Sequence, residues 1–243
     1  MKTTFASIAL ALLSAATQAQ DVPSLLKTAD RFRNGSEVNM QVESLVTLHG
    51  ADGTQEKERR YTVFVQARHQ SLVLMQSPAE TGQKVLMLGD DFWLLMPGSQ
   101  RPMRITPMQK LLGDASTGDI ATLSWSEDYT GTLVGEEKCG DTPCLHLSLQ
   151  ASRKSVSYQR IELWLGKTRH EPIKADLYVQ SDKLAKQARF VMDKGQALVT
   201  EMVLQDQLSN KKETRIRYVS RTPRTVPDNW LNPMFLARNP SLD

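Results

Sequence analysis

The chain has 243 residues, enough for one large domain or two small ones, and its 40% apolar and 23% charged residues can build a sizeable core. This composition excludes a wholly disordered chain. Thirty Lys and Arg against 27 Asp and Glu leave a net charge of only +3, whereas nucleic-acid binding requires a concentrated basic surface. Ten methionines against 6 phenylalanines indicate apolar surface that adapts its shape.

The first residues have the features of a secretory signal peptide. Lys2 precedes an apolar run over 5–13, and Thr17-Gln18-Ala19 presents small residues where signal peptidase requires them. We expect cleavage after Ala19, which leaves an exported, soluble single domain over 20–243. The apolar run is too short to span a bilayer, and no cysteine follows the cleavage site to carry a lipid anchor.

The two cysteines, Cys139 and Cys144, enclose the turn-rich run 140–143. In an exported protein this spacing predicts a disulfide at a hairpin tip. A redox motif needs two intervening residues and a helix start, and a structural zinc site needs four ligands, so neither fits. We expect no metal and no cofactor.

Apolar residues at helical spacing predict one amphipathic helix over 21–33, with Asp21 at its N-cap. From Glu37 onward, apolar and polar residues alternate with the period of a strand. The alternation recurs to residue 219 in about ten or eleven short runs separated by turns. This pattern predicts an antiparallel meander that curls into a barrel or part of one.

Two segments interrupt the alternation. Residues 108–125 have helical candidates at each end and small residues between them, which predicts a compact lid or plug inserted between strands. The tail from Arg221 contains four prolines with apolar residues between them. Because proline is excluded from central strands, we expect the tail to pack over a barrel edge.

The hairpin over 84–97 is apolar on both faces, and its turn falls at Gly89-Asp90 or Asp90-Asp91. One face carries Leu86, Leu88, Trp93 and Leu95, and the other carries Val85, Met87, Phe92, Leu94 and Met96. A sheet with one wet side alternates apolar with polar residues instead. Either the hairpin is central, with helix 21–33 or the lid on its second face, or one face lines a cavity for an apolar ligand or docks a partner.

The sequence contains no nucleophile elbow, phosphate-binding loop, zinc-protease motif or dinucleotide-binding fingerprint. Arg101 and Arg104 follow the apolar hairpin, and Arg215 and Arg217 share one face of the last strand. Such arginines are either solvated strand charges or a basic rim that meets an anionic head group or an acidic transporter surface.

The run over 82–97, with Arg101, Arg104-Ile105 and the run over 113–121, resembles the outer-membrane lipoprotein-sorting family of LolA-like periplasmic proteins. Weaker matches lie at 29–31, 158–164 and 172–174. The resemblance implies a mainly β fold, an incomplete antiparallel barrel whose concave face is covered by helices around an apolar cavity. It also implies a periplasmic, non-enzymatic carrier of lipidated or hydrophobic molecules, which contacts membranes transiently and works with exporters of the RND or MMPL type.

Strand phase selects the candidate cavity residues, although period alone does not assign the inner face. They are Val38, Met40, Val42, Val63, Val65, Leu86, Leu88, Trp93 and Leu95. We expect a monomeric carrier of a lipid-like cargo without catalytic residues. The alternatives are an accessory interaction module docked on a membrane exporter and an enzyme acting on envelope lipids.

Overall fold

The structure is a computed structural model that describes residues 21–35, 39–67, 69–113, 115–121, 124–207 and 212–242. The expected signal peptide with its cleavage site after Ala19 lies outside these residues, and so does the candidate cavity residue Val38.

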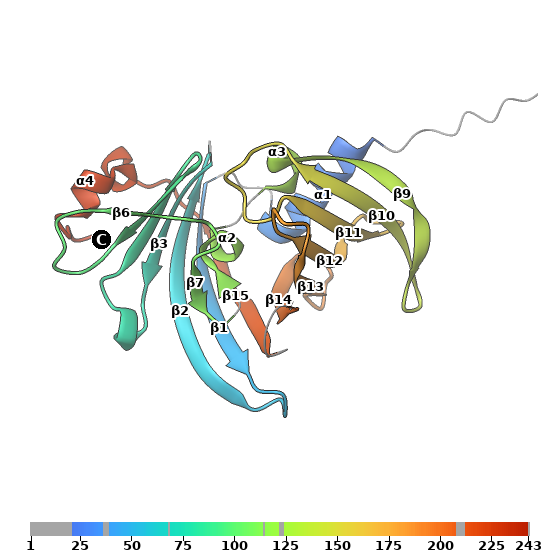
Figure 1. Ribbon diagram of the computed structural model, residues 1–243, viewed down its shortest axis with the longest axis horizontal. Helices are drawn as coiled ribbons and strands as arrows, with labels where there is room; N and C mark the ends of the chain where they lie inside the picture. The colour runs from blue at the N-terminus through green and yellow to red at the C-terminus, as the bar shows by residue number, and fades with distance from the viewer. Residues whose placement is uncertain are drawn as a thin grey trace, which may run out of the picture.

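Thirteen described strands form one antiparallel sheet in the order β6-β5-β4-β3-β2-β1-β15-β14-β13-β12-β11-β10-β9. The strands are β1 (Met40–His49), β2 (Gln55–Gln66), β3 (Gln70–Met75), β4 (Lys84–Leu88), β5 (Asp91–Leu95), β6 (Met103–Ile105), β9 (Tyr129–Cys139), β10 (Thr142–Ala151), β11 (Arg160–Gly166), β12 (Pro172–Tyr178), β13 (Leu184–Met192), β14 (Val199–Asp206) and β15 (Glu213–Pro223). The sheet curves strongly and stays open (Figure 1).

The predicted mainly β, incomplete antiparallel barrel is confirmed, but ten or eleven strands is too few. The two additional strands are β6, which has only three residues, and β9, most of whose side chains are exposed. Neither carries the buried apolar alternation by which the other strands are recognised. The last strand, β15, pairs with both β1 and β14, so it lies in the middle of the sheet.

The predicted helix forms as α1 (Val22–Asn34), with Asp21 at its N-cap position and a proline in the first turn. Leu25, Leu26 and Ala29 are buried in the main core with the concave side of the sheet. Asp30 of α1 also holds the start of the short helix α3 (Trp125–Asp128), because its carboxylate accepts hydrogen bonds from the backbone N–H groups of Trp125 (3.0 Å) and Ser126 (2.8 Å). A capping carboxylate from another helix thus fixes α3 against α1.

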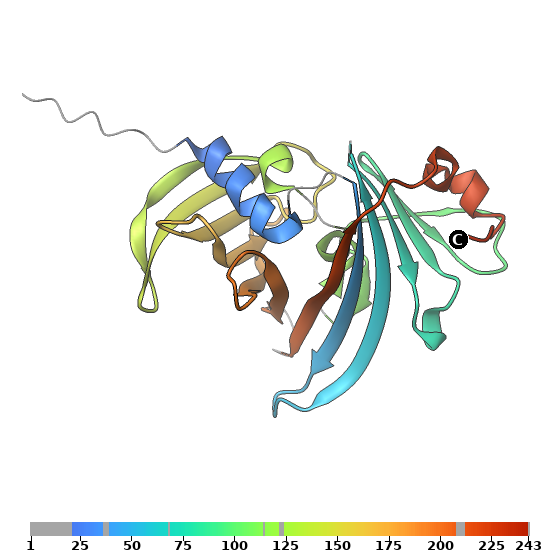
Figure 2. The same ribbon diagram turned by 180° about the vertical axis from the view of Figure 1, so that it is seen from behind.

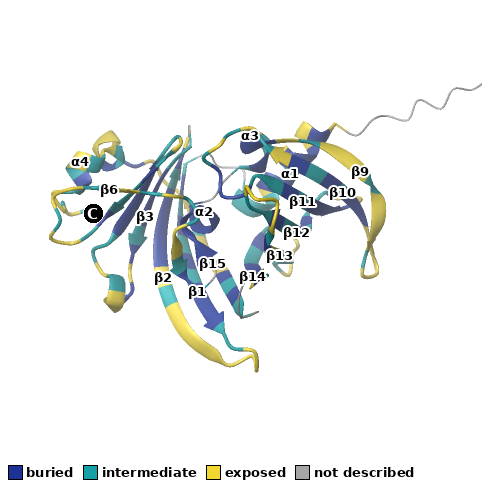
Figure 3. Ribbon diagram, in the orientation of Figure 1, coloured by how far each residue is buried: buried dark blue, intermediate teal, exposed yellow. Residues whose placement is uncertain are grey.

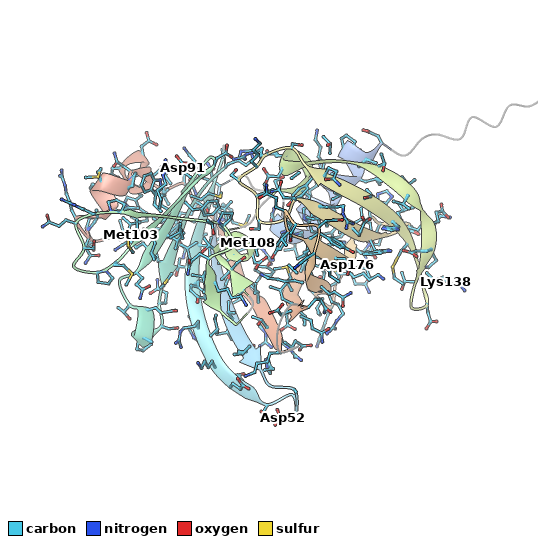
Figure 4. The ribbon with its side chains drawn as sticks, in the orientation of Figure 1. Asp52, Asp91, Met103, Met108, Lys138 and Asp176 are labelled. Carbon is cyan, nitrogen blue, oxygen red and sulfur yellow. A yellow bond between two sulfur atoms is a disulfide. The ribbon has the colours of Figure 1, made fainter. Side chains whose placement is uncertain are left out.

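Residues 108–113 and 115–121 form a plug that packs in the main core. The plug comprises β7 (Lys110–Leu112), β8 (Ala115–Ser116) and α2 (Thr117–Ile120), so its first part is a strand and not the expected helical turn. Residues 115–121 are all buried, and Figure 4 shows Met108 at the start of the plug, between the two halves of the sheet. A Cβ on Gly118 would collide with Ser157 Oγ, so the plug packs closely against the segment before β11.

A buried polar network anchors this plug. Asp119 Oδ2 lies 2.6 Å from Lys186 Nζ and accepts a hydrogen bond from Ser116 Oγ at 2.7 Å, while Oδ1 accepts one from Tyr158 at 2.7 Å. Burial acts to raise the pKa of Asp119, but the Lys186 ammonium and the bonds from Ser116 outweigh it, so the pKa lies below its ordinary value.

The C-terminal tail covers the convex side of β2–β5 with the 3-10 helix η2 (Asp228–Leu231) and α4 (Pro233–Leu236) (Figure 2). Val226, Trp230 and Leu236 are buried there against a set of sheet residues, Phe64, Leu72, Leu86 and Leu95. The Trp230 and Phe64 rings meet edge to face at 5.4 Å. The second apolar face of the hairpin is therefore covered by the tail, not by α1 or the plug. The tail crosses a face of the sheet, where we expected it at an edge.

The hairpin turn falls at Gly89-Asp90, the first of the two possible positions, because Leu88 pairs with Asp91 and Leu86 with Trp93. Gly89 has φ of +59°, a conformation that suits glycine. Another 3-10 turn, η1 (Pro78–Glu80), joins β3 to β4.

The predicted disulfide joins Cys139 to Cys144 across the β9–β10 turn, with a Cα–Cα distance of 6.0 Å. Lys138 marks the exposed tip of this hairpin, at the far end of the sheet from the tail (Figures 3 and 4).

Trp230→Ala tests how much the tail stabilises the fold. Trp230 is 5% exposed, so its truncation should cost about 3–5 kcal/mol of unfolding free energy, through lost burial and an unfilled space. Urea denaturation measures this. Met234→Ala, in the same tail but 60% exposed, should cost no more than about 0.5 kcal/mol. Equal effects of the two substitutions would show that the tail is not part of the core.

The lowered pKa of Asp119 predicts an acid-sensitive fold. The folded protein binds this proton more weakly than the unfolded chain, so the stabilisation is complete above about pH 4 and is lost as the pH falls further. Asp119→Asn should cost about 3–5 kcal/mol at pH 7, because Lys186 keeps a buried charge without its counter-ion, and the variant should lose less stability between pH 5 and pH 3. Urea denaturation over this pH range is the measurement. Asp141→Asn, at the exposed hairpin tip, is the control, expected to stay within about 0.5 kcal/mol of wild type.

Candidate functional site

A cavity of about 340 Å³ opens between the C-terminal half of α1, the start of α3 and the strands β1–β4 and β15. Its walls are mixed in character. The floor is apolar and comes from the sheet, whereas the mouth is charged and comes largely from the helices. The lining residues include Lys27, Asp30, Arg31, Arg33, Met40, Val42, Val65, His69, Met87, Glu127, Tyr218 and Arg221.

The floor brings together three of the candidate residues, Met40 and Val42 of β1 and Val65 of β2. Met87 of β4 completes it and was not among the candidates. Val63, another candidate, points to the same side but is only 1% exposed within the main core. Two flexible methionine side chains and two small branched ones give this floor a shape that can adjust to its contents.

The other four candidates lie on the opposite side of the sheet, which corrects the expected face. Pairing across β2–β4 places Val63 beside Val73 and Val73 beside Val85, so the concave face continues through Val85. Leu86, one residue later, points to the convex side, and Leu88, Trp93 and Leu95 share that side, where they pack with the C-terminal tail. A period of two says which residues of one strand share a face, but the phase between neighbouring strands depends on their register.

Two arginines dominate the mouth of the cavity. The Arg33 side chain is 10% exposed, lies 3.6 Å from Asp30, and has its guanidinium 3.9 Å from the centre of the Trp125 ring. Arg221 Nη2 donates hydrogen bonds to the carbonyl oxygens of Val199 (2.7 Å) and Arg33 (3.0 Å). Burial lowers the pKa of Arg221, and the positive charge of Arg33 lowers it further, against the opposing effect of Tyr218.

None of the four expected rim arginines lines this cavity. Arg104 makes a bidentate ion pair with Asp91 and lies 4.5 Å over the Trp93 ring, and Arg101 is exposed in the preceding loop. Arg215 and Arg217 lie on the convex side of β15 and pair with Glu213 (2.6 Å) and Glu201 (3.5 Å). The rim arginines are instead Arg31, Arg33 and Arg221, which have no periodic signature in the sequence.

His69 connects α3 to the sheet at the opposite wall. Its Nε2 lies 3.1 Å from Asp128 Oδ1 and 3.2 Å from Glu127 Oε2, and Arg153 Nη1 lies 3.1 Å from Asp128. Burial raises the pKa of Asp128, although the neighbouring His69 and Arg153 act against this shift. These groups close the cavity on the side away from Arg221 and connect the helical wall to the start of β3.

Within the described part of the chain, no group of three or more His, Cys, Asp or Glu side chains is arranged to hold a metal ion. Among those same residues, no helix has the length and apolar content to cross a bilayer. The lining of the cavity offers apolar contact from its floor and charge-assisted hydrogen bonding from its arginines.

A family model described only as an uncharacterized protein matches residues 67–238. The fold is similar to a LolA superfamily protein from Nitrosomonas europaea, with 29% identity and a TM-score of 0.77 over 86% of this chain and 96% of that one. It is also similar to an outer membrane lipoprotein-sorting protein domain from Vibrio parahaemolyticus, with 18% identity and a TM-score of 0.69 over 90% and 100%. A DUF1329 family protein from Desulfovibrio piger has 20% identity and a TM-score of 0.68 over 86% and 95%. None of the curated proteins matches.

These similarities extend over nearly the whole length of each relative, so they concern the entire sheet and not a shared fragment. The matched family region runs from the end of β2 to the C-terminal tail and includes the plug. Because this region exceeds half of the sequence, the chain belongs to the family that the model describes, and its fold is that of the LolA-like, outer-membrane lipoprotein-sorting proteins.

Proposed function

We propose that this protein is a periplasmic carrier that holds a hydrophobic or lipid-like molecule in the cavity beside α1 and transfers it between membranes. The observation that carries the proposal is the apolar floor of Met40, Val42, Val65 and Met87 beneath a cavity of about 340 Å³. This volume falls within the range of about 300–1,000 Å³ that is typical of small-molecule sites. An ordinary core fills such a space, because an empty cavity is destabilising.

The fold supports the same function. One similar structure, from Vibrio parahaemolyticus, is described as an outer membrane lipoprotein-sorting protein domain, and the present chain has an open sheet whose concave side is covered by helices and a plug. The cavity is bounded by α1, a helix whose backbone takes no part in the strand pairing of the sheet. Movement of such an element can admit or release a cargo without breaking strand pairs. An exporter of the RND or MMPL type is the proposed partner for loading.

A second candidate function is that of an accessory module docked on a membrane exporter. The free edge strand β9 favours it, because Leu133 and Val134 are 37% and 58% exposed there and an unpaired edge can add a strand from another chain. A module of this kind needs a stoichiometric partner in native membranes, whereas a carrier needs only a transient one. Affinity purification from solubilised membranes separates the two functions.

Val65→Trp tests the carrier function by filling the cavity. Lipid extraction and mass spectrometry of the purified wild type should show a bound amphiphile, and the larger indole should reduce its amount several-fold, because it occupies the space above the floor. Val134→Trp introduces the same side chain on the exposed edge of β9 and should retain wild-type amounts. A wild-type protein with neither co-purifying nor exchangeable lipid would contradict the proposal.

A further inference from the structure

A β-bulge in β15 turns Arg221 toward the cavity. The pairing of β1 with β15 shifts register between Glu43 and Ser44, so that Ser44 pairs with Tyr218 and Glu43 with Ser220, and Val219 has no partner. Val219 is 62% exposed. Without this extra residue, Arg217 and Arg221 would share the convex face. With it, Arg221 pairs with Val42, a residue of the cavity floor.

The strand partners also leave room for this side chain. Beyond the pair of Glu201 with Arg217, the pairing of β15 with β14 stops, while its pairing with β1 continues to Pro223. The guanidinium of Arg221 fills part of the resulting gap and bonds to the carbonyl oxygen of Val199, at the start of β14. Arg221 is therefore held at a sheet opening that leads into the cavity.

The charges around the cavity are unbalanced. Four cationic side chains line it, those of Lys27, Arg31, Arg33 and Arg221, against two carboxylates, Asp30 and Glu127. Asp30 also accepts two backbone hydrogen bonds and one from Ser124 at the start of α3, and Glu127 lies 3.2 Å from His69. Arg221 donates hydrogen bonds to the carbonyl oxygens of Arg33 and Val199 and lies 4.5 Å over the Tyr218 ring, and within the described part of the chain it forms no ion pair with a carboxylate.

From this arrangement we infer that Arg221, together with Arg33, binds the anionic head group of the cargo, a carboxylate or a phosphate, while its alkyl chain lies on the floor formed by Met40, Val42, Val65 and Met87. The inference rests on the proposed carrier function and names the chemical class of its ligand. A partly buried guanidinium beside a second one is stabilised by an anion, whose negative charge offsets the two positive charges and whose oxygens accept hydrogen bonds from the guanidinium N–H groups.

The apolar floor distinguishes this ligand from a free anion. Inorganic phosphate or a short carboxylate would leave the floor without contacts, whereas a single-chain amphiphile occupies both parts of the site at once. The basic mouth and the apolar floor lie within one cavity. A fatty acid, whose carboxylate is attached directly to its alkyl chain, can therefore contact both at once.

The test compares charged and neutral ligands with the same chain. Delipidated full-length mature protein is titrated with oleate, methyl oleate, 1-oleoyl lysophosphatidate and monoolein below their aggregation concentrations, and with acetate and inorganic phosphate alone. Oleate should bind about tenfold or more tightly than methyl oleate, as a charge-assisted hydrogen bond predicts. Arg221→Gln should reduce this preference to within about twofold, because the affinity for oleate falls much further than the affinity for methyl oleate. Comparison of oleate with lysophosphatidate identifies the preferred head group.

The matched control is Arg217→Gln, which removes the same charge four residues earlier from the convex side of the same strand, and the preference for oleate should persist. Arg221→Lys should restore part of the preference. If Arg221→Gln does not fold, the salt dependence of the wild type replaces it, and the preference for oleate should shrink between about 0.05 and 0.5 M salt as the charges are screened.

Several results would overturn the inference. Equal affinity of the wild type for oleate and methyl oleate would show that the protein carries a lipid but has no site for its anionic head group. The same loss in Arg217→Gln and Arg221→Gln would show a general charge effect. Phosphate or acetate that binds as tightly as the amphiphiles would indicate a site for free anions. If none of the chain-bearing ligands binds, the carrier function itself fails along with the inference.

Discussion

The structure depends on one constraint, which is that a sheet with apolar residues on both faces must be covered on both faces by the same chain. Over β2–β5 the convex side is covered by the C-terminal tail, with Trp230 packed edge to face on Phe64. The concave side is covered by α1, α3 and the plug, which share one buried cluster with the sheet. Burial of this apolar surface on both sides is the main contribution to the stability of such a fold.

Two carboxylates fix the elements that cover the concave side of the sheet. Asp119 anchors the plug through Lys186, Ser116 and Tyr158, all within 2.7 Å. Asp30 fixes α3 to α1 by accepting its first backbone N–H groups. The plug is therefore part of the core, and the cavity lies beside α1, where the cover meets β1, β2 and β15. A carrier needs this combination, because the sheet must remain intact while the site beside it exchanges its contents.

The charged part of the site comes from an irregularity of the sheet. A bulge at Val219 reverses the facing of the residues that follow it in β15, and the early end of β14 leaves space for the redirected Arg221. Bulges commonly occur where a strand must present a side chain at a functional site. Arg217 and Arg221 consequently differ in environment, since Arg217 is solvated and paired with Glu201 while Arg221 bonds to backbone carbonyls inside the opening.

The sequence by itself determined the elements that local physics controls. Helix α1, the alternating strands and the Cys139–Cys144 pair follow from periodicity, turn residues and spacing, whereas the sequence limited the hairpin turn to two positions and strand pairing chose Gly89-Asp90. The sequence also showed that the hairpin is apolar on both faces and that Met40 and Val42 share a face of their strand, whereas the pairing of Met40 with Val65 brought the third residue to that face. Only the tertiary structure decided that Leu86, Leu88, Trp93 and Leu95 face the tail, and that Arg221 rather than Arg215 or Arg217 reaches the cavity. These facts depend on strand register and on one unpaired residue, which are set by contacts between segments distant in sequence, and a shift of one residue reverses every face.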